Sequence, residues 1–183
     1  MGCSVPRNWE YLIYGGIYMA SMTTRKRLEF KNDDQYNTCE ELWTAIRHLI
    51  PTDKIIWEAF MLGNTSSRSV DILRDLGFSV IGHHTIDFFK EDFGQLIVSN
   101  PPYSIKKQIF KRLALLDKPF ILILPISTIS KQFVKVLQRD KLQIIIPNKR
   151  MQFEKAGEQL KRCWFDCVYF CYKMNLEKDI TFL

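Results

Sequence analysis

Four consecutive residues, Asn100-Pro101-Pro102-Tyr103, combine residue types and spacing that could orient an amino group for chemistry. The two prolines fix φ twice and remove two backbone donors, and Pro101 also holds Asn100 in an extended conformation. The stiff segment therefore offers backbone carbonyls and the Asn100 amide oxygen as acceptors, while Tyr103 adds a ring on which a planar base can stack. This set suits the NH₂ group of a heterocycle or an amide. The simpler alternative is a rigid turn that ends a strand.

The apolar pattern around this segment predicts the elements that position it. Residues 95–99 form an apolar run typical of a buried strand, and 105–116 follow with helical spacing. Upstream, a strand over 54–60, a small-residue turn, a helix that ends at Gly77 and a strand over 78–81 form a βαβ unit. Further helices are expected over 38–50, with a capping box of Thr38 and Glu41, and over 130–137. Further strands are expected over 120–124, 142–146, 163–172 and 180–183.

This alternation of helices and continuous apolar strands predicts a three-layer α/β domain. In open α/β sheets, ligands bind beyond the carboxyl ends of the strands. Two segments fall there in this sequence, the turn after Phe60 and the segment that begins at Asn100. These two segments are the candidate ligand sites.

The segment Ser-Asn-Pro-Pro-Tyr-Ser over 99–104, after a hydrophobic strand, resembles the catalytic motif of class I amino-nitrogen methyltransferases of the N6-adenine type. The resemblance spans roughly residues 34–170. It implies a Rossmann-like methyltransferase sheet, mostly parallel with an antiparallel C-terminal strand. It also implies S-adenosylmethionine as cofactor, S-adenosylhomocysteine as product, and catalytic roles for Asn100, Pro101, Pro102 and Tyr103.

Three further segments resemble the cofactor-binding parts of that family. Residues 57–66 are similar to its cofactor turn, with Glu58 at the acidic position, Phe60 at the aromatic one, and Gly63 and Asn64 in the bend. The Asp-Phe pair at 87–88 is similar to one in which Asp accepts from the cofactor's adenine amino group and Phe packs on the ring. The segment that begins at residue 36 resembles the family's N-terminal cofactor segment. The implied cofactor residues are Tyr36, Thr38, Glu58, Phe60, Gly63, Asn64, Asp87 and Phe88.

Charge and length bear on the macromolecular partner. The net charge of +6 and the pI of about 9.1 favour a nucleic-acid partner only weakly. The residues predicted to contact phosphates are Lys106, Lys107, Lys149 and Arg150. Residues 23–183 are expected to form one methyltransferase domain after a poorly constrained leader over 1–22, a compact form similar to viral or phage versions. Without a separate target-recognition domain, recognition must come from loops or a partner subunit.

Composition bears on the compartment. The five cysteines are odd in number and form no CxxC pair, which predicts buried thiols in a reducing intracellular compartment, cytoplasm or nucleus, rather than a metal site. The adjacent His83 and His84 do not favour a metal either, because neighbouring residues of an extended chain point to opposite sides. No apolar run reaches the length that spans a bilayer.

Two alternatives to adenine methylation stay open. Protein glutamine and guanine-N2 methyltransferases are relatives that also use Asn-Pro-Pro-aromatic motifs. The other alternative is a catalytically inactive member that serves as a binding module. It is favoured by Leu62 and Asn64, which stand where the family usually has glycines. It is also favoured by Gly82-His83-His84-Thr85, where the family has a carboxylate for the cofactor ribose.

Overall fold

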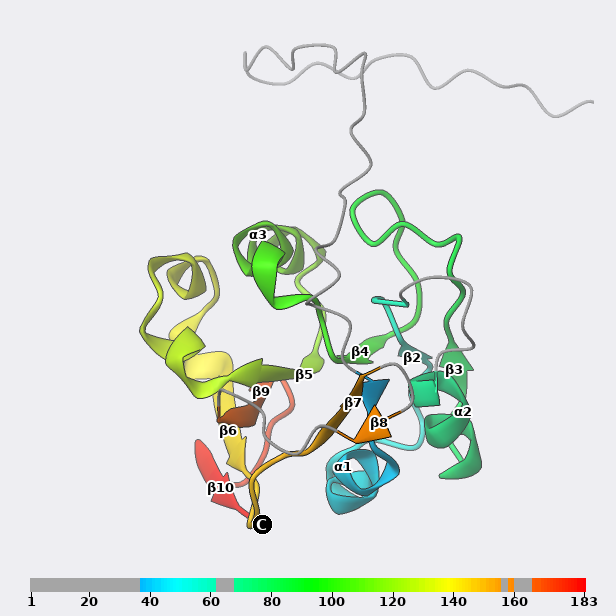
Figure 1. Ribbon diagram of the computed structural model, residues 1–183. Coiled ribbons are helices and arrows are strands. Elements are labelled where there is room, and N and C mark those ends of the chain that lie inside the picture. Colours follow the sequence, from blue (N-terminus) through cyan, green and yellow to red (C-terminus); the bar gives the residue numbers. More distant parts are fainter. Residues whose placement is uncertain (1–36, 62–67, 156–157, 160–165) are drawn as a thin grey trace, which may run out of the picture.

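The computed structural model describes residues 37–61, 68–155, 158–159 and 166–183 of the chain. A seven-stranded sheet lies at its centre, in the order β10-β6-β9-β5-β4-β2-β3. Figure 1 shows α3 on one face of this sheet and α1 and α2 on the other. The bounds of the seven strands are β2 (Ile56–Trp57), β3 (Val80–Ile81), β4 (Leu96–Ser99), β5 (Phe120–Pro125), β6 (Leu142–Ile146), β9 (Cys167–Tyr172) and β10 (Ile180–Phe182).

Strand direction confirms the predicted fold class. Strands β3, β2, β4 and β5 are parallel neighbours, and β10 is parallel to β6. Strand β9, near the C-terminus, runs antiparallel between β5 and β6. The described chain is therefore a three-layer α/β domain with a Rossmann-like, mostly parallel sheet.

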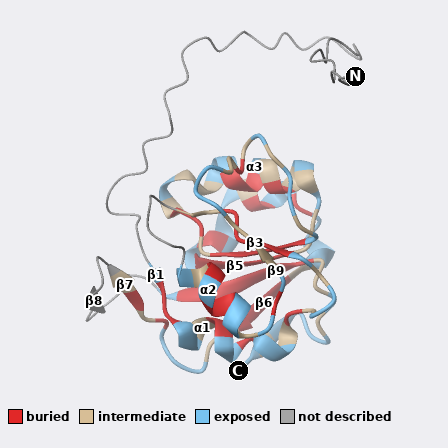
Figure 2. Cartoon of the chain, turned by 90° about the vertical axis from the view of Figure 1, so that its right-hand side faces the viewer, coloured by how far each residue is buried: buried red, intermediate tan, exposed pale blue. Residues whose placement is uncertain are grey.

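The two faces of the sheet carry separate apolar cores because successive strand residues point to opposite sides. In β5, Ile121 and Ile123 pack into the core under α1 and α2, whereas Phe120, Leu122 and Leu124 pack into the core under α3. Strands β4 and β5 are buried along their whole length, as expected for central strands covered on both faces. Figure 2 shows the buried colour concentrated on the central strands and the exposed colour on the outer faces of the helices.

The helices match the apolar pattern in place but differ in length. Helix α1 (Glu40–Ala45) buries Trp43, α2 (Arg68–Asp75) buries Val70, Ile72 and Leu73, and α3 (Lys106–Leu116) buries Ile109, Phe110 and Leu113. Within the described ranges, no helix has both the length and the apolar character needed to cross a membrane. The helix predicted over 130–137 is wrong: two 3₁₀ segments, Ile126–Ser130 and Gln132–Val136, flank an extended Lys131. Their β-branched residues have low helix propensity, which favours such short pieces.

The predicted capping box at Thr38 is also wrong. The N-cap of α1 is Cys39, without a side-chain hydrogen bond, and α1 gives way to a 3₁₀ segment over Arg47–Leu49. Thr38 lies instead in β1 (Asn37–Thr38) of a small antiparallel sheet with β7 (Phe153–Lys155) and β8 (Glu158–Gln159). It pairs with Phe153, so a tertiary contact replaces the local cap.

Gly77 ends α2 in a Schellman arrangement. Its N–H donates to the Arg74 carbonyl at 2.8 Å, the Phe78 N–H donates to the Leu73 carbonyl at 3.1 Å, and its φ is +93°. A side chain is strained at this φ, so we expect Gly77→Ala to lower the free energy of unfolding by about 1–2 kcal/mol in urea denaturation. Ser79→Ala, at an exposed position nearby, should change it by less than about 0.5 kcal/mol. Equal stability of the two variants would contradict the reason given for Gly77.

Candidate functional site

The strand order places a topological switch point between β2 and β4. From β2 the chain passes to β3 on one side and then returns to β4 on the other side of β2. Such a reversal of direction is the switch point at which open α/β sheets bind ligands, beyond the carboxyl ends of the strands. Glu58 and Phe60 follow β2, and Asn100 to Tyr103 follow β4. The structure thus brings the two segments singled out in the sequence to neighbouring strand ends.

The segment after β4 is held by packing and by its own hydrogen bonds. Pro101 and Pro102 are buried, and Tyr103 begins a 3₁₀ turn over Tyr103–Ile105 that leads into α3. The Tyr103 hydroxyl donates to Asn100 Oδ1 at 3.0 Å and lies 3.5 Å from Cys167 Sγ. The hydrogen bond fixes the orientation of the Asn100 amide, so the acceptor is preorganised.

The Tyr103 ring is half-buried and contacts both apolar cores. The Lys106 ammonium lies 5.2 Å from the centre of this ring, at cation–π distance. Lys106 therefore contacts the candidate catalytic motif itself. Its predicted contact with phosphate and the predicted stacking of a base on Tyr103 stay predictions.

Glu58 is a buried carboxyl group at the end of β2. Its Oε1 accepts a hydrogen bond from the Phe60 N–H at 3.2 Å and another from the Ser99 hydroxyl. Burial raises the pKa of Glu58 from 4.5 to about 7, and both hydrogen bonds act in the opposite direction. A buried titratable group with a perturbed pKa, located just beyond the end of a strand at the switch point, is typical of functional sites.

The aromatic residues beside Glu58 form one cluster. The rings of Phe60 and Phe88 lie 4.5 Å apart between centroids, and Phe88 also contacts Trp57 at 5.6 Å and Phe89 at 5.3 Å. Two predicted cofactor residues from different segments, Phe60 and Phe88, are thereby adjacent. Phe88 is 3% exposed, so its ring belongs to the apolar core on the α3 side of the sheet.

Asp87 is held within its own loop. Its Oδ1 accepts from the Phe89 N–H at 3.0 Å, and its Oδ2 forms an ion pair with Lys90. Of the other predicted cofactor residues, Thr38 is buried in β1 of the small sheet. Tyr36, Gly63 and Asn64 lie outside the described residues.

The predicted phosphate-binding residues lie at two places beyond the carboxyl ends of the parallel strands. Lys107 is exposed in the first turn of α3, directly after the Asn-Pro-Pro-Tyr segment. Lys149 and Arg150 follow β6, and β6 has the same direction as β5 because both are antiparallel to β9. Arg150 Nε lies 2.9 Å from Asp166 Oδ1, whereas the exposed Lys149 takes part in no ion pair among the described residues.

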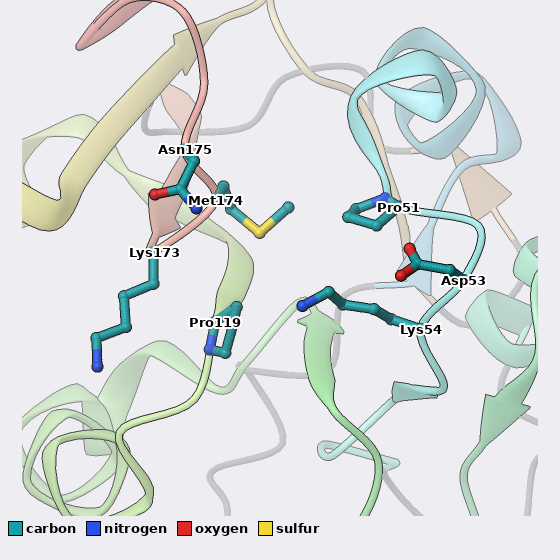
Figure 3. Close-up of a pocket in the computed structure, with 7 residues that line it drawn as sticks. All are labelled: Pro51, Asp53, Lys54, Pro119, Lys173, Met174 and Asn175. Carbon is teal, nitrogen blue, oxygen red and sulfur yellow. The ribbon is translucent and has the colours of Figure 1, made fainter.

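A cavity of about 260 Å³ lies at the opposite edge of the sheet. Figure 3 shows Pro51 and Lys54 facing Pro119, Lys173 and Met174 across it. These residues precede β2 and β5 or follow the antiparallel β9, so they mark the amino ends of the parallel strands. The cavity contains none of the candidate residues, and it is smaller than the roughly 300–1,000 Å³ of ordinary ligand pockets.

Ser99 is the site residue that sequence reasoning missed. It is completely buried, and its hydroxyl links the end of β4 to Glu58. The sequence could have indicated Ser99, because a hydroxyl residue ends an otherwise apolar strand directly before Asn100. A buried polar side chain needs a partner, so Ser99 predicts an acceptor on a neighbouring strand end.

Comparisons with known proteins add a similarity in structure. No protein-family model matches the sequence, and no curated protein matches it. Among solved structures, TrmN from Thermus thermophilus is similar with 11% sequence identity and a TM-score of 0.33. The similarity covers 73% of this chain and 48% of that chain, so this protein spans about half its length. At this level the similarity carries no functional conclusion, and the Rossmann-like fold follows from the strand order itself.

Proposed function

We propose that this protein binds S-adenosylmethionine and transfers its methyl group to the N6 amino group of adenine in DNA or RNA. The observation that carries the proposal is the position of Asn100-Pro101-Pro102-Tyr103. It follows a buried strand and lies at the switch point beside the buried carboxyl group of Glu58. An acceptor-rich, donor-poor segment at that place suits an amino group presented to a bound cofactor.

The described residues fit the chemistry of this cofactor. Bound S-adenosylmethionine supplies an electrophilic methyl group on a sulfonium. Glu58 and Phe60 would hold its amino-acid end, because a buried carboxylate favours a cationic group and an aromatic ring packs on apolar atoms. Asp87 and Phe88 would hold its adenine end, where Asp87 would have to exchange part of its loop bonding for the ligand.

Asn100 and Pro101 would orient the acceptor. The Asn100 side-chain oxygen and the Pro101 carbonyl would accept hydrogen bonds from the two N6 hydrogens, so that the nitrogen faces the methyl group. As the nitrogen–methyl bond forms the sulfur–methyl bond would break, S-adenosylhomocysteine would leave, and one N6 proton would pass to solvent. An amide oxygen accepts up to two hydrogen bonds, so the bond from Tyr103 does not preclude one from the substrate. A target base in a duplex must first leave the stack. Positioning of this kind contributes roughly 7–11 kcal/mol at best.

The proposed nucleic-acid contact predicts how salt affects binding. Lys149 is exposed beyond the carboxyl ends of the parallel strands. We expect Lys149→Ala to weaken nucleic-acid binding and to lower the slope of the log binding constant against log salt by about 1. Lys178 is equally exposed but precedes β10, at the opposite edge of the sheet. Fluorescence anisotropy with labelled duplexes over a salt series should therefore leave the slope of Lys178→Ala at the wild-type value. Equal slopes for Lys149→Ala and the wild type would place the nucleic acid elsewhere.

Transfer of a labelled methyl group tests the reaction class. Purified protein is incubated with methyl-labelled S-adenosylmethionine and separate DNA, RNA and protein acceptors, with Asn100→Ala as the background. Label on adenine in DNA or RNA supports the proposal, whereas label on guanine would favour the guanine-N2 alternative. Label in protein alone would instead favour the glutamine methyltransferase alternative, which shares the amide geometry of the Asn-Pro-Pro segment.

A catalytically inactive binding module is the second candidate. Two observations favour it: the segment after β3 carries Gly82, His83 and His84 rather than a carboxylate, and the Asp87 carboxyl is bonded within its loop. Calorimetric titration with S-adenosylmethionine separates the candidates. Folded protein that releases no heat at millimolar cofactor, about a thousandfold above a micromolar Kd, is the result expected of the inactive module.

A further inference from the structure

Glu58 and Ser99 join the carboxyl ends of two neighbouring strands. Ser99 is the last residue of β4, is completely buried and donates its hydroxyl hydrogen bond to Glu58 Oε1. The Phe60 N–H donates to the same oxygen at 3.2 Å, which anchors the carboxyl group on the β2 side. Because Asn100 follows Ser99 directly, this link fixes the backbone from which Asn100 projects.

We propose that Glu58 and Ser99 form a positioning pair, in which ionised Glu58 holds the end of β4 and thereby orients Asn100 for methyl transfer. The inference rests on the proposed function and adds a pH-dependent control of the same site. A carboxylate accepts a hydrogen bond about twice as strong as a neutral group does. Loss of a proton from Glu58 therefore tightens the link to Ser99.

Burial and two hydrogen bonds set the ionisation of Glu58. Burial raises its pKa to about 7, the bonds from Ser99 and Phe60 lower it, and no charged side chain among the described residues alters it. Gly82 packs against Glu58 from the β3 side, since a Cβ there would lie 3.3 Å from Glu58 Cβ. The titratable groups beyond these contacts are exposed His83 and His84 after β3, and Tyr103 and Cys167 on the Asn100 side.

The pair predicts a distinctive pH profile. In the wild type, kcat should rise with pH as Glu58 loses its proton, with a midpoint below about 7 because the cationic end of the bound cofactor favours the ionised carboxylate. Ser99→Ala removes the hydrogen bond that favours the ionised form of Glu58. The midpoint of the kcat profile should therefore move to higher pH, and kcat at neutral pH should fall about tenfold. Cofactor Kd, measured at a pH above both midpoints where Glu58 is ionised in each protein, should change by less than about twofold. Glu58→Gln keeps an oxygen acceptor but cannot ionise, so its profile should lose the rise near neutral pH.

Thr128→Val is the matched control for Ser99→Ala. Thr128 is also completely buried, at the carboxyl end of β5, but its hydroxyl has no hydrogen-bond partner among the described residues. Loss of the Thr128 hydroxyl should leave the midpoint of the kcat profile unchanged. An equal shift in both variants would mean that removal of any buried hydroxyl perturbs the site, and the pairing would be overturned.

Nuclear magnetic resonance tests the pair without any activity. In the wild type, the carboxyl carbon of Glu58 and the backbone amide of Asn100 should titrate with one midpoint, and in Glu58→Gln the Asn100 amide should not titrate there. An Asn100 amide that ignores the Glu58 titration would overturn the proposal. If the wild type transfers no methyl group, the proposed function fails, but this titration still decides whether Glu58 controls the position of Asn100.

Discussion

Asn100→Ala is expected to lower methyl transfer at least about a hundredfold while leaving cofactor affinity within about twofold of the wild type. The amide oxygen orients the substrate nitrogen toward the methyl group, and loss of one preorganised polar contact at a reacting centre typically costs 10²–10³ in rate, as an order-of-magnitude estimate. Glu58 is held by the Phe60 N–H and the Ser99 hydroxyl, so removal of the Asn100 side chain leaves these bonds of Glu58 in place. Single-turnover transfer and calorimetric cofactor binding measure the two quantities separately.

Two variants sharpen the Asn100 result. Gln108→Ala removes an exposed amide from α3 and should keep wild-type transfer. Tyr103→Phe keeps the ring but removes the hydrogen bond to Asn100, so transfer should fall only severalfold. Equal loss of transfer and of cofactor binding in Asn100→Ala would show that Asn100 supports the fold rather than the reaction.

Glu58→Gln is expected to remove a loss of about 3 kcal/mol in the free energy of unfolding, which the wild type undergoes as the pH rises. The pKa of Glu58 is raised from 4.5 to about 7 by burial, so below pH 4.5 the group is neutral in both the folded and the unfolded protein. Between these two values the unfolded chain releases the proton while the folded chain retains it, and stability falls as pH rises. Above about 7 the full loss is present, about 1.4 kcal/mol for each pH unit that separates the folded pKa from the unfolded pKa.

The measured quantity is the difference in unfolding free energy between the wild type and Glu58→Gln. Urea denaturation at a series of pH values should show this difference moving in favour of the variant as pH rises from 4.5 to about 7. Glu177→Gln removes an exposed carboxyl and should give a curve parallel to the wild type. A parallel curve for Glu58→Gln as well would contradict the buried, perturbed state of Glu58.

Local sequence predicted the acceptor half of the site well. An apolar run, two prolines and a helical pattern act over neighbouring residues, and the structure has β4 at Leu96–Ser99 and α3 from Lys106, within one residue of expectation. The elements that failed depend on distant contacts. Thr38 pairs with Phe153, far along the chain, and this pairing outweighs the local capping signal.

The contacts within the site could not be predicted from the sequence for a related reason. Glu58 and Ser99 meet only because β2 and β4 are neighbours, although β3 lies between them in the chain. The bond from Tyr103 to Asn100 depends on the 3₁₀ turn that begins after the prolines. Residue types indicated which side chains are candidates for the site, whereas strand order and turn geometry determined which of them form hydrogen bonds with one another.

The atom that receives the methyl group decides whether the proposed reaction is correct. DNA and RNA are incubated with the protein and S-adenosylmethionine carrying a trideuterated methyl group, then digested to nucleosides and analysed by mass spectrometry. We expect trideuterated N6-methyladenine in the wild-type reaction and its loss in Asn100→Ala. A folded wild-type protein that binds the cofactor but labels no nucleoside, or labels a nucleoside at any atom other than adenine N6, would contradict the proposed function.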